Sequence, residues 1–84
     1  MPATHKQIGE FLESPDWTVE EKEVIKWQFG LNGDFKTALW QAIVRADENN
    51  LERLRHGFPL EVKGYESWVY GDLGQRLRRA GLSI

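Results

Sequence analysis

The side chains that most often perform acid–base or metal chemistry are few in this chain and stand apart. His5 and His56 are the only histidines, and neither shares the spacing of a metal site with a second histidine and a carboxylate. Asp47 and Glu48 are adjacent carboxylates, but a capping role at a helix start accounts for them. The chain has no cysteine, so it has no thiolate metal site and no disulfide. We therefore expect no catalytic group, metal or cofactor.

Glycine-rich and nucleophile motifs lead to the same expectation. The sequence contains no serine elbow, no P-loop and no dinucleotide-binding glycine pattern. Gly30 and Gly33 have the spacing of a loop that clamps nucleotides in one RNA-binding module, but that module is built on strands. Both flanks of this loop have helical period, so we interpret the two glycines as a turn between helices. The sequence predicts a protein that is not an enzyme.

The length and charge of the chain suit one small domain. Its 84 residues predict a single domain over 1–84, with a net charge of −2. Residues 1–24 hold six acids and two bases, and residues 51–84 hold six bases and four acids. That basic excess is weaker than the dense stripe of a nucleic-acid-binding protein. No apolar run approaches the roughly 20 residues of a membrane span, and the N-terminus lacks a signal-peptide core. We expect a soluble, cytoplasmic protein.

Residues 35–46 are apolar around most of a helix circumference. At about 100° per residue, Trp40 and Val44 form a stripe beside a larger main stripe. A helix of this kind is usually buried by neighbours on two sides. We therefore expect it to be the central helix of the fold, packed through its main stripe. That stripe consists of Phe35, Leu39, Ala42, Ile43 and Ala46.

Five further segments carry helical period and helix-end signals. Thr18 with Glu21 forms a capping-box pattern, and Asp47 is a suitable N-cap. Gly57 suits a left-handed C-terminal cap, and Pro59 suits the first position of the next helix. The segments are residues 3–13, 18–30, 48–56, 59–70 and 73–81. The predicted fold is a compact all-α domain of five or six short helices.

Four tryptophans are a large number for a chain of this length. Tryptophan is enriched in binding interfaces as well as in small cores. The stripe of Trp40 and Val44 is therefore either a second core contact or an exposed anchor for a partner. Trp17 precedes a helix cap and is a second candidate for an exposed anchor. Trp27 and Trp68 share apolar faces with their neighbours, so we expect them inside.

Charged residues supply the other candidates for partner binding. Glu20 and Glu23 lie in the first turns of a predicted helix, where they suit the positive end of the macrodipole. They could also meet the basic nucleic-acid channel of a host effector. The last predicted helix directs three arginines mostly outward, where they either form a solvated face or contact phosphates as in a helix-turn-helix protein. These arginines are Arg76, Arg78 and Arg79.

The stretch 35–62 resembles a motif found in short, uncharacterised proteins of bacteriophages and prophages. The motif reads Phe-x-x-Ala-Leu-aromatic-x-Ala-Ile-x-x-Ala-Asp, then Asn-Leu-x-x-Leu, then Phe-Pro-x-Glu-Val. The usual aromatic is phenylalanine where this chain has Trp40. The resemblance covers about a third of the chain and implies a phage or mobile-element setting, but no activity. The matching residues are Phe35, Ala38, Leu39, Trp40, Ala42, Ile43, Ala46, Asp47, Asn50, Leu51, Leu54, Phe58, Pro59, Glu61 and Val62.

Size, setting and the lack of catalytic groups together favour a binding function. We expect a small phage-encoded accessory protein that binds and inhibits or redirects a host protein in the bacterial cytoplasm. An anti-CRISPR-like inhibitor of a nucleic-acid-binding effector complex is one specific form. The first alternative is a small helical DNA-binding regulator, whose affinity would fall steeply with salt. The second is a self-assembling structural protein, which would form homo-oligomers.

Overall fold

The computed structural model describes residues 3–84, and within this range all regular secondary structure is helical. The all-α fold predicted from the sequence is therefore confirmed. Each helix begins and ends within two residues of its predicted segment. The helices are α1 (His5–Glu13), α2 (Val19–Gln28), α3 (Asp34–Arg45), α4 (Glu48–Gly57), α5 (Pro59–Val69) and α6 (Leu73–Arg79). None of these six helices is long and apolar enough to cross a membrane.

Local capping explains where several helices begin. The Thr18 hydroxyl accepts a hydrogen bond from the Glu21 N–H at 3.3 Å, and the Glu21 carboxylate accepts one from the Thr18 N–H at 2.8 Å. This reciprocal pair is the predicted capping box. The left-handed cap predicted at Gly57 is wrong, because among residues 3–84 the glycines with positive φ are Gly30 and Gly81. A single residue, Phe58, separates α4 from α5 and leaves no room for that turn.

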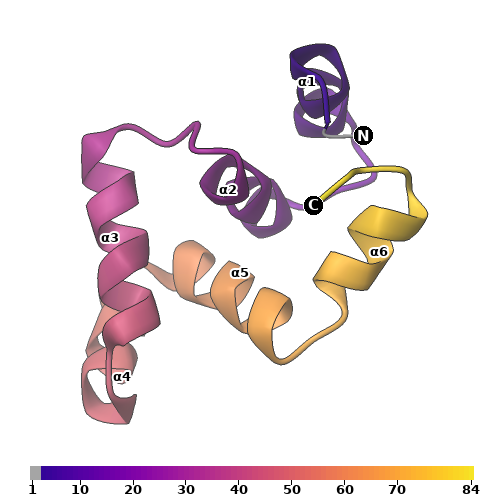
Figure 1. Cartoon of the computed structure of the whole chain (residues 1–84). Coiled ribbons are helices and arrows are strands. Elements are labelled where there is room, and N and C mark those ends of the chain that lie inside the picture. The colour runs from indigo at the N-terminus through magenta and orange to yellow at the C-terminus, as the bar shows by residue number, and fades with distance from the viewer. Residues whose placement is uncertain (1–2) are drawn as a thin grey trace.

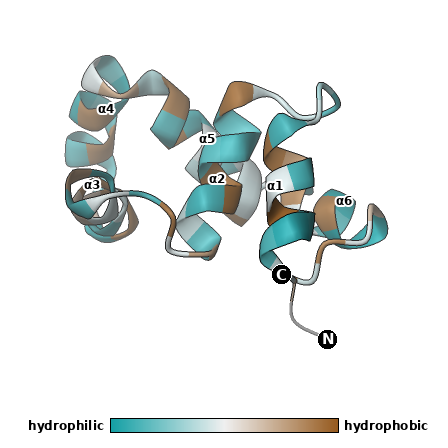
Figure 2. Ribbon diagram, turned by 90° about the horizontal axis from the view of Figure 1, so that it is seen from above, coloured by the Kyte–Doolittle hydropathy of each residue, from teal (hydrophilic) through white to brown (hydrophobic). Residues whose placement is uncertain are grey.

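The helix at the centre of the fold is α5. It packs against α2, α3, α4 and α6, and its contact with α2 is the most extensive between any two helices. The prediction that residues 35–46 form the central helix is therefore wrong. Instead α3 lies beside α4 at one end of the molecule, and α1 and α6 lie at the other end (Figure 1; Figure 2).

The close approach of α2 and α5 depends on Gly64. A Cβ atom at this position would lie 2.7 Å from the Glu20 carbonyl oxygen and 2.9 Å from the Val24 side chain. Both distances are too short for a real Cβ contact, so a larger residue would push the helices apart. A glycine inside a helix costs up to about 1 kcal/mol relative to alanine. The packing of α5 on α2 offsets that cost.

The buried face of α3 differs from the predicted one. Trp40 is fully buried, and its ring stacks on that of Trp27 with centroids 4.5 Å apart and planes 6° apart. Phe35 is 64% exposed, although the sequence analysis placed it in the core. The buried face is thus rotated by about 70° from the predicted stripe, at 100° per residue. The core residues of the chain are Ile8, Val24, Ile25, Leu39, Trp40, Ile43, Val62, Leu73, Leu77 and Leu82.

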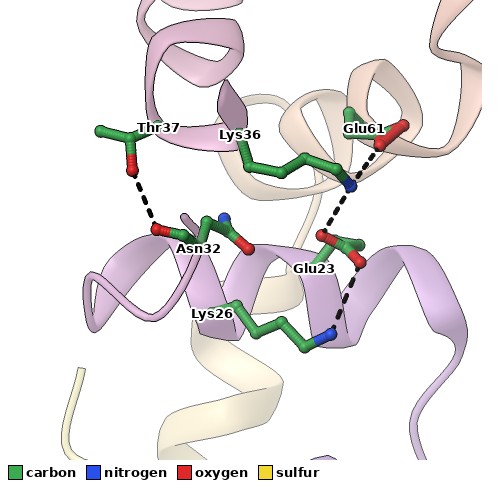
Figure 3. Close-up of polar contacts among 6 residues, drawn as sticks. All are labelled: Glu23, Lys26, Asn32, Lys36, Thr37 and Glu61. Carbon is green, nitrogen blue, oxygen red and sulfur yellow. Dashed lines mark hydrogen bonds and ion pairs between the residues drawn. The ribbon is translucent and has the colours of Figure 1, made fainter. Parts of the chain in front are cut away.

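A partly buried ion-pair network accompanies this rotation. Lys36 lies on the inner side of α3, and its ammonium group is 2.8 Å from the Glu61 carboxylate and 3.3 Å from that of Glu23 (Figure 3). The hydrogen bond to Glu61 raises the pKa of Lys36 and outweighs its partial desolvation. Because these two carboxylates compensate the lysine charge, the adjacent Trp40 can turn inward. Burying a large indole stabilises more than burying the alanines of the predicted stripe.

Candidate functional site

The eight residues that the sequence nominates for partner binding do not form one surface. They extend from α3 at one end of the molecule to α6 at the other (Figure 1). Trp17 and Arg76 do meet, because the Arg76 guanidinium lies 6.0 Å from the centre of a Trp17 ring. The eight are Trp17, Glu20, Glu23, Trp40, Val44, Arg76, Arg78 and Arg79.

The tryptophan candidates are built into the fold. Trp40 is fully buried, so of its two predicted roles the core contact is the one observed and the exposed anchor is not, whereas Val44 is 49% exposed. Trp17 is half-buried and stacks on Phe11 with ring centroids 5.8 Å apart. Trp27 is half-buried, as is Trp68, although the sequence analysis placed both inside. The ranking of the four by exposure therefore fails, because Trp27 lies over Trp40 and shields it.

The acidic candidates on α2 are paired within the chain. The Glu20 carboxylate lies 3.1 Å from the Lys63 ammonium, and Glu23 lies 3.6 Å from Lys26 and 3.3 Å from Lys36 (Figure 3). Backbone N–H groups at the helix start, and then Lys63, hold the pKa of Glu20 below its usual value. These lysines compensate the charge that was expected to attract a basic partner. The contacts assign both glutamates a structural role.

Arg76 also has partners within the chain. It contacts the buried Glu21 carboxylate at 2.7 Å and Asp72 at 3.0 Å. Burial works to raise the pKa of Glu21, but the Thr18 N–H and Arg76 outweigh it and lower that pKa overall. Arg78 donates from Nε to the Ile84 carbonyl at 3.1 Å, and Arg79 is exposed. The three arginines therefore do not form one uncommitted basic surface.

An open groove of about 440 Å³ runs between α3 and α4. Its floor is apolar, with half-buried Ala46 and Leu54, and exposed Arg45 and Arg53 stand on opposite sides of it. Ala42 and Asn50 complete the lining. We name this surface the α3–α4 groove. The four lining residues that come from the resemblance motif are Ala42, Ala46, Asn50 and Leu54.

The groove arises because α3 carries small side chains on this side and because α3 and α4 both pack on α5. Ala42 and Ala46 lie one turn apart on the side of α3 that looks toward α4. Their single methyl groups reach only a short way across the gap. Both α3 and α4 pack on α5, so α5 holds the two helices in position while the space between their outer sides stays open.

Two phenylalanines stand where the chain enters α3 and leaves α4. The rings of Phe35 and Phe58 are 5.9 Å apart and tilted by 53°. Phe35 precedes Ala42 by two helical turns on the same side of α3, and Phe58 follows Leu54 by about one turn. Helical geometry therefore places the exposed Phe35 ring along the line of the groove.

The arginines of the groove differ from the other arginine of α4. Among the residues that the structure describes, Arg45 and Arg53 take part in no ion pair. Arg55 points to the opposite side of α4, where it pairs with Glu52 and lies 3.2 Å from Glu66. That side borders a second groove of about 410 Å³, which is also lined by Glu48 and Tyr70. The α3–α4 groove thus carries two uncompensated positive charges above an apolar floor.

Helical periodicity alone does not indicate this site, because it places Phe35, Ala42 and Ala46 on the predicted core face. One signal could have indicated the groove. At 100° per residue, Arg45 falls on the same side of the helix as Ala42, and an arginine without a partner belongs at the surface. Arg53 gave no such signal, because a charged residue on a short polar helix is ordinary.

Comparison of the chain with known protein families, with curated proteins and with solved structures finds no match. The site must therefore be interpreted from its own chemistry. Within residues 3–84, no three histidine or carboxylate side chains gather closely enough to hold a metal ion. The α3–α4 groove combines apolar surface and guanidinium groups, which are suited to recognition.

Proposed function

We propose that the protein acts by binding another protein through the α3–α4 groove. The observation that supports this most is a groove lined by two arginines that have no ion-pair partner among residues 3–84, with the exposed Phe35 about two turns away on the same side of α3. Aromatic residues and arginine are the types most enriched in interface anchors. Most of the Phe35 side chain is exposed and lies outside the core, which favours a role in binding.

The biological form of the proposal follows from the resemblance of residues 35–62 to phage proteins. We propose that the protein is phage-encoded and inhibits or redirects a host protein in the bacterial cytoplasm. Occupying a functional surface of the partner would suffice for inhibition, and an effector of a defence system such as CRISPR is one candidate. The resembling stretch contributes both sides of the α3–α4 groove, which gives that stretch a shared physical role.

The DNA-binding alternative draws less support. A regulator of that kind would use the outward arginines of α6, but Arg76 is paired with Glu21 and Asp72 and Arg78 binds a terminal carbonyl. The self-assembly alternative needs no different chemistry and would appear as adducts between copies of the chain.

Site-specific photo-crosslinking in a bacterial host tests the proposal. The photoreactive amino acid p-benzoyl-phenylalanine would replace Phe35 in one variant, Tyr70 in a second and Val44 in a third. Tyr70 is a matched control, because it is aromatic and 77% exposed but lies at the second groove. We expect a discrete adduct with one host protein from position 35 and none from positions 70 and 44.

Three outcomes would contradict the proposal. The same adducts from all three positions would indicate unspecific collision, and no adduct from position 35 would leave the groove without a partner. An adduct from position 44 alone would indicate that the partner binds at the stripe of Trp40 and Val44 instead of at the groove.

A further inference from the structure

We infer that the α3–α4 groove recognises an acidic amphipathic segment of the partner protein. Such a segment carries apolar side chains on one face and carboxylates on both sides of that face. This inference rests on the proposed function, since it specifies the chemistry of the partner at the same site.

The two positive charges of the groove indicate that the bound segment of the partner carries carboxylates. A guanidinium group binds a carboxylate through two parallel hydrogen bonds, and such charge-assisted pairs are stronger than neutral ones. Arg45 comes from the last turn of α3 and Arg53 from α4, so the two stand on either side of the floor. The carboxylates nearest to them in sequence have other partners, because Asp47 accepts the Asn50 N–H at 2.8 Å as the cap of α4, and Glu52 contacts Arg55 and His56. Both guanidinium groups are thus available to an acidic partner.

The apolar floor of the groove indicates that the bound segment carries apolar side chains between those carboxylates. Ala42, Ala46 and Leu54 offer methyl groups and no charge. A nucleic-acid strand would satisfy the arginines, but it would leave the methyl groups without an apolar contact. The juxtaposition of charge and apolar floor therefore favours a protein segment over a nucleic acid.

The shape of the site suits a helix as the bound segment. From Phe35 to Ala46 the site extends along eleven residues of chain, or about 16 Å at 1.5 Å per residue. A partner helix of similar length would place apolar anchors at i, i+4 and i+7 on the floor. Its flanking glutamates would then face Arg45 on one side and Arg53 on the other.

Peptide binding to the purified full-length chain tests this inference. Fluorescence polarisation would compare labelled helical peptides of about 14 residues, which span about 21 Å. The first has leucine anchors flanked by glutamates, the second has lysines in place of the glutamates, and the third keeps the glutamates but replaces the leucines with serines. A labelled single-stranded DNA is the fourth probe. We expect the leucine–glutamate peptide to bind about tenfold or more tightly than each of the others, since both features are required.

Charge reversal identifies the surface that binds. The double variant Arg45→Glu/Arg53→Glu should bind the leucine–glutamate peptide about tenfold or more weakly than the parent chain does. It should bind the lysine peptide more tightly than the parent chain does. The double variant Arg78→Glu/Arg79→Glu is the matched control, because it changes the total charge equally on α6. We expect this control to change the peptide affinity by less than about twofold. The thermal melt of Arg45→Glu/Arg53→Glu should match that of the parent chain, because neither Arg45 nor Arg53 has an ion-pair partner among residues 3–84. The control loses the hydrogen bond from Arg78 to the Ile84 carbonyl, so its melt is measured to show that it is folded at the temperature of the binding assay.

Several results would overturn the inference. These are equal or tighter binding of the lysine or serine peptide, tightest binding of DNA, absence of peptide binding, and equal loss in the two double variants. The crosslinking experiment separates this failure from failure of the proposed function. If position 35 still yields a specific host adduct, the groove binds a protein of different chemistry, and only the acidic amphipathic partner is rejected.

Discussion

Two helix junctions of this protein that share α3 are built in opposite ways. At the junction of α2, α3 and α5, the Trp27 and Trp40 rings stack and Lys36 joins two carboxylates from different helices (Figure 3). At the α3–α4 groove, α3 presents two alanines toward α4, and the two arginines have no ion-pair partner among residues 3–84. The first junction is closed and its charges are compensated, whereas the second is open and its charges are not.

This contrast separates stability from binding on a single helix. Packing density and paired charges at the closed junction hold α3 in place. The opposite side of α3 contributes little to the core, so its residues can serve a partner without weakening the fold. Substitutions on the two sides of α3 should therefore affect different measurements. Three predictions test how the closed junction contributes to stability, and the first compares it with the open side of α3.

The largest effect should come from truncating the buried tryptophan. Trp40→Ala removes a fully buried ring and its stacking contact, and should lower the free energy of unfolding by about 3–5 kcal/mol. Phe35→Ala is the matched control on the open side and should cost less than about 1 kcal/mol. Urea denaturation followed by circular dichroism measures both. Equal losses for the two variants would mean that the two sides of α3 do not differ in the way described.

A smaller effect should follow from adding one methyl group where α5 meets α2. Gly64→Ala places a Cβ within 2.7 Å of the Glu20 carbonyl oxygen, and should destabilise the protein by about 1–3 kcal/mol. Gly9→Ala in α1 is the control, because its Cβ would meet no atom within 4 Å. It should instead stabilise by up to about 1 kcal/mol through helix propensity. Thermal melts of both variants decide the sign, and a Gly64→Ala protein as stable as Gly9→Ala would show that α2 and α5 are not tightly packed.

The smallest of the three effects should come from Lys36 at the closed junction. Lys36→Met leaves the buried Glu61 carboxylate without its 2.8 Å partner, and should cost about 1–2 kcal/mol at neutral pH. The pKa of Lys36 is raised in the folded protein above its ordinary value of 10.5. The contribution of charged Lys36 to the stability of the protein is therefore complete below pH 10.5. It is lost as the pH rises through the pKa that Lys36 has in the folded protein.

Urea midpoints measured across this alkaline range test the pH dependence. The difference in stability between the parent chain and Lys36→Met should shrink as the pH rises. The double variant Lys36→Met/Glu61→Gln should recover part of the loss at neutral pH, because it removes the unpaired charge. A gap between parent and Lys36→Met that stays constant with pH would assign the loss to packing instead of to the ion pair.

Sequence alone determined the positions of the helices, because their signals are local. The capping box of Thr18 and Glu21, the Asp47 cap and the proline that opens α5 each act within one turn. Those contacts form in the same way whatever surrounds the helix, so the sequence is enough to predict them. Single residues at the helix ends were still mispredicted, as at Gly57, where the next helix follows too closely.

The orientation of each helix was decided only by the tertiary structure. Trp40 faces inward and Phe35 outward because Glu23 and Glu61, which are distant in the sequence, compensate Lys36 beside the core. The α3–α4 groove depends in the same way on α5, which supports both helices and leaves a space between them. Helical periodicity identifies which residues share a face, but the contacts between helices determine which face is buried and which remains open to a partner.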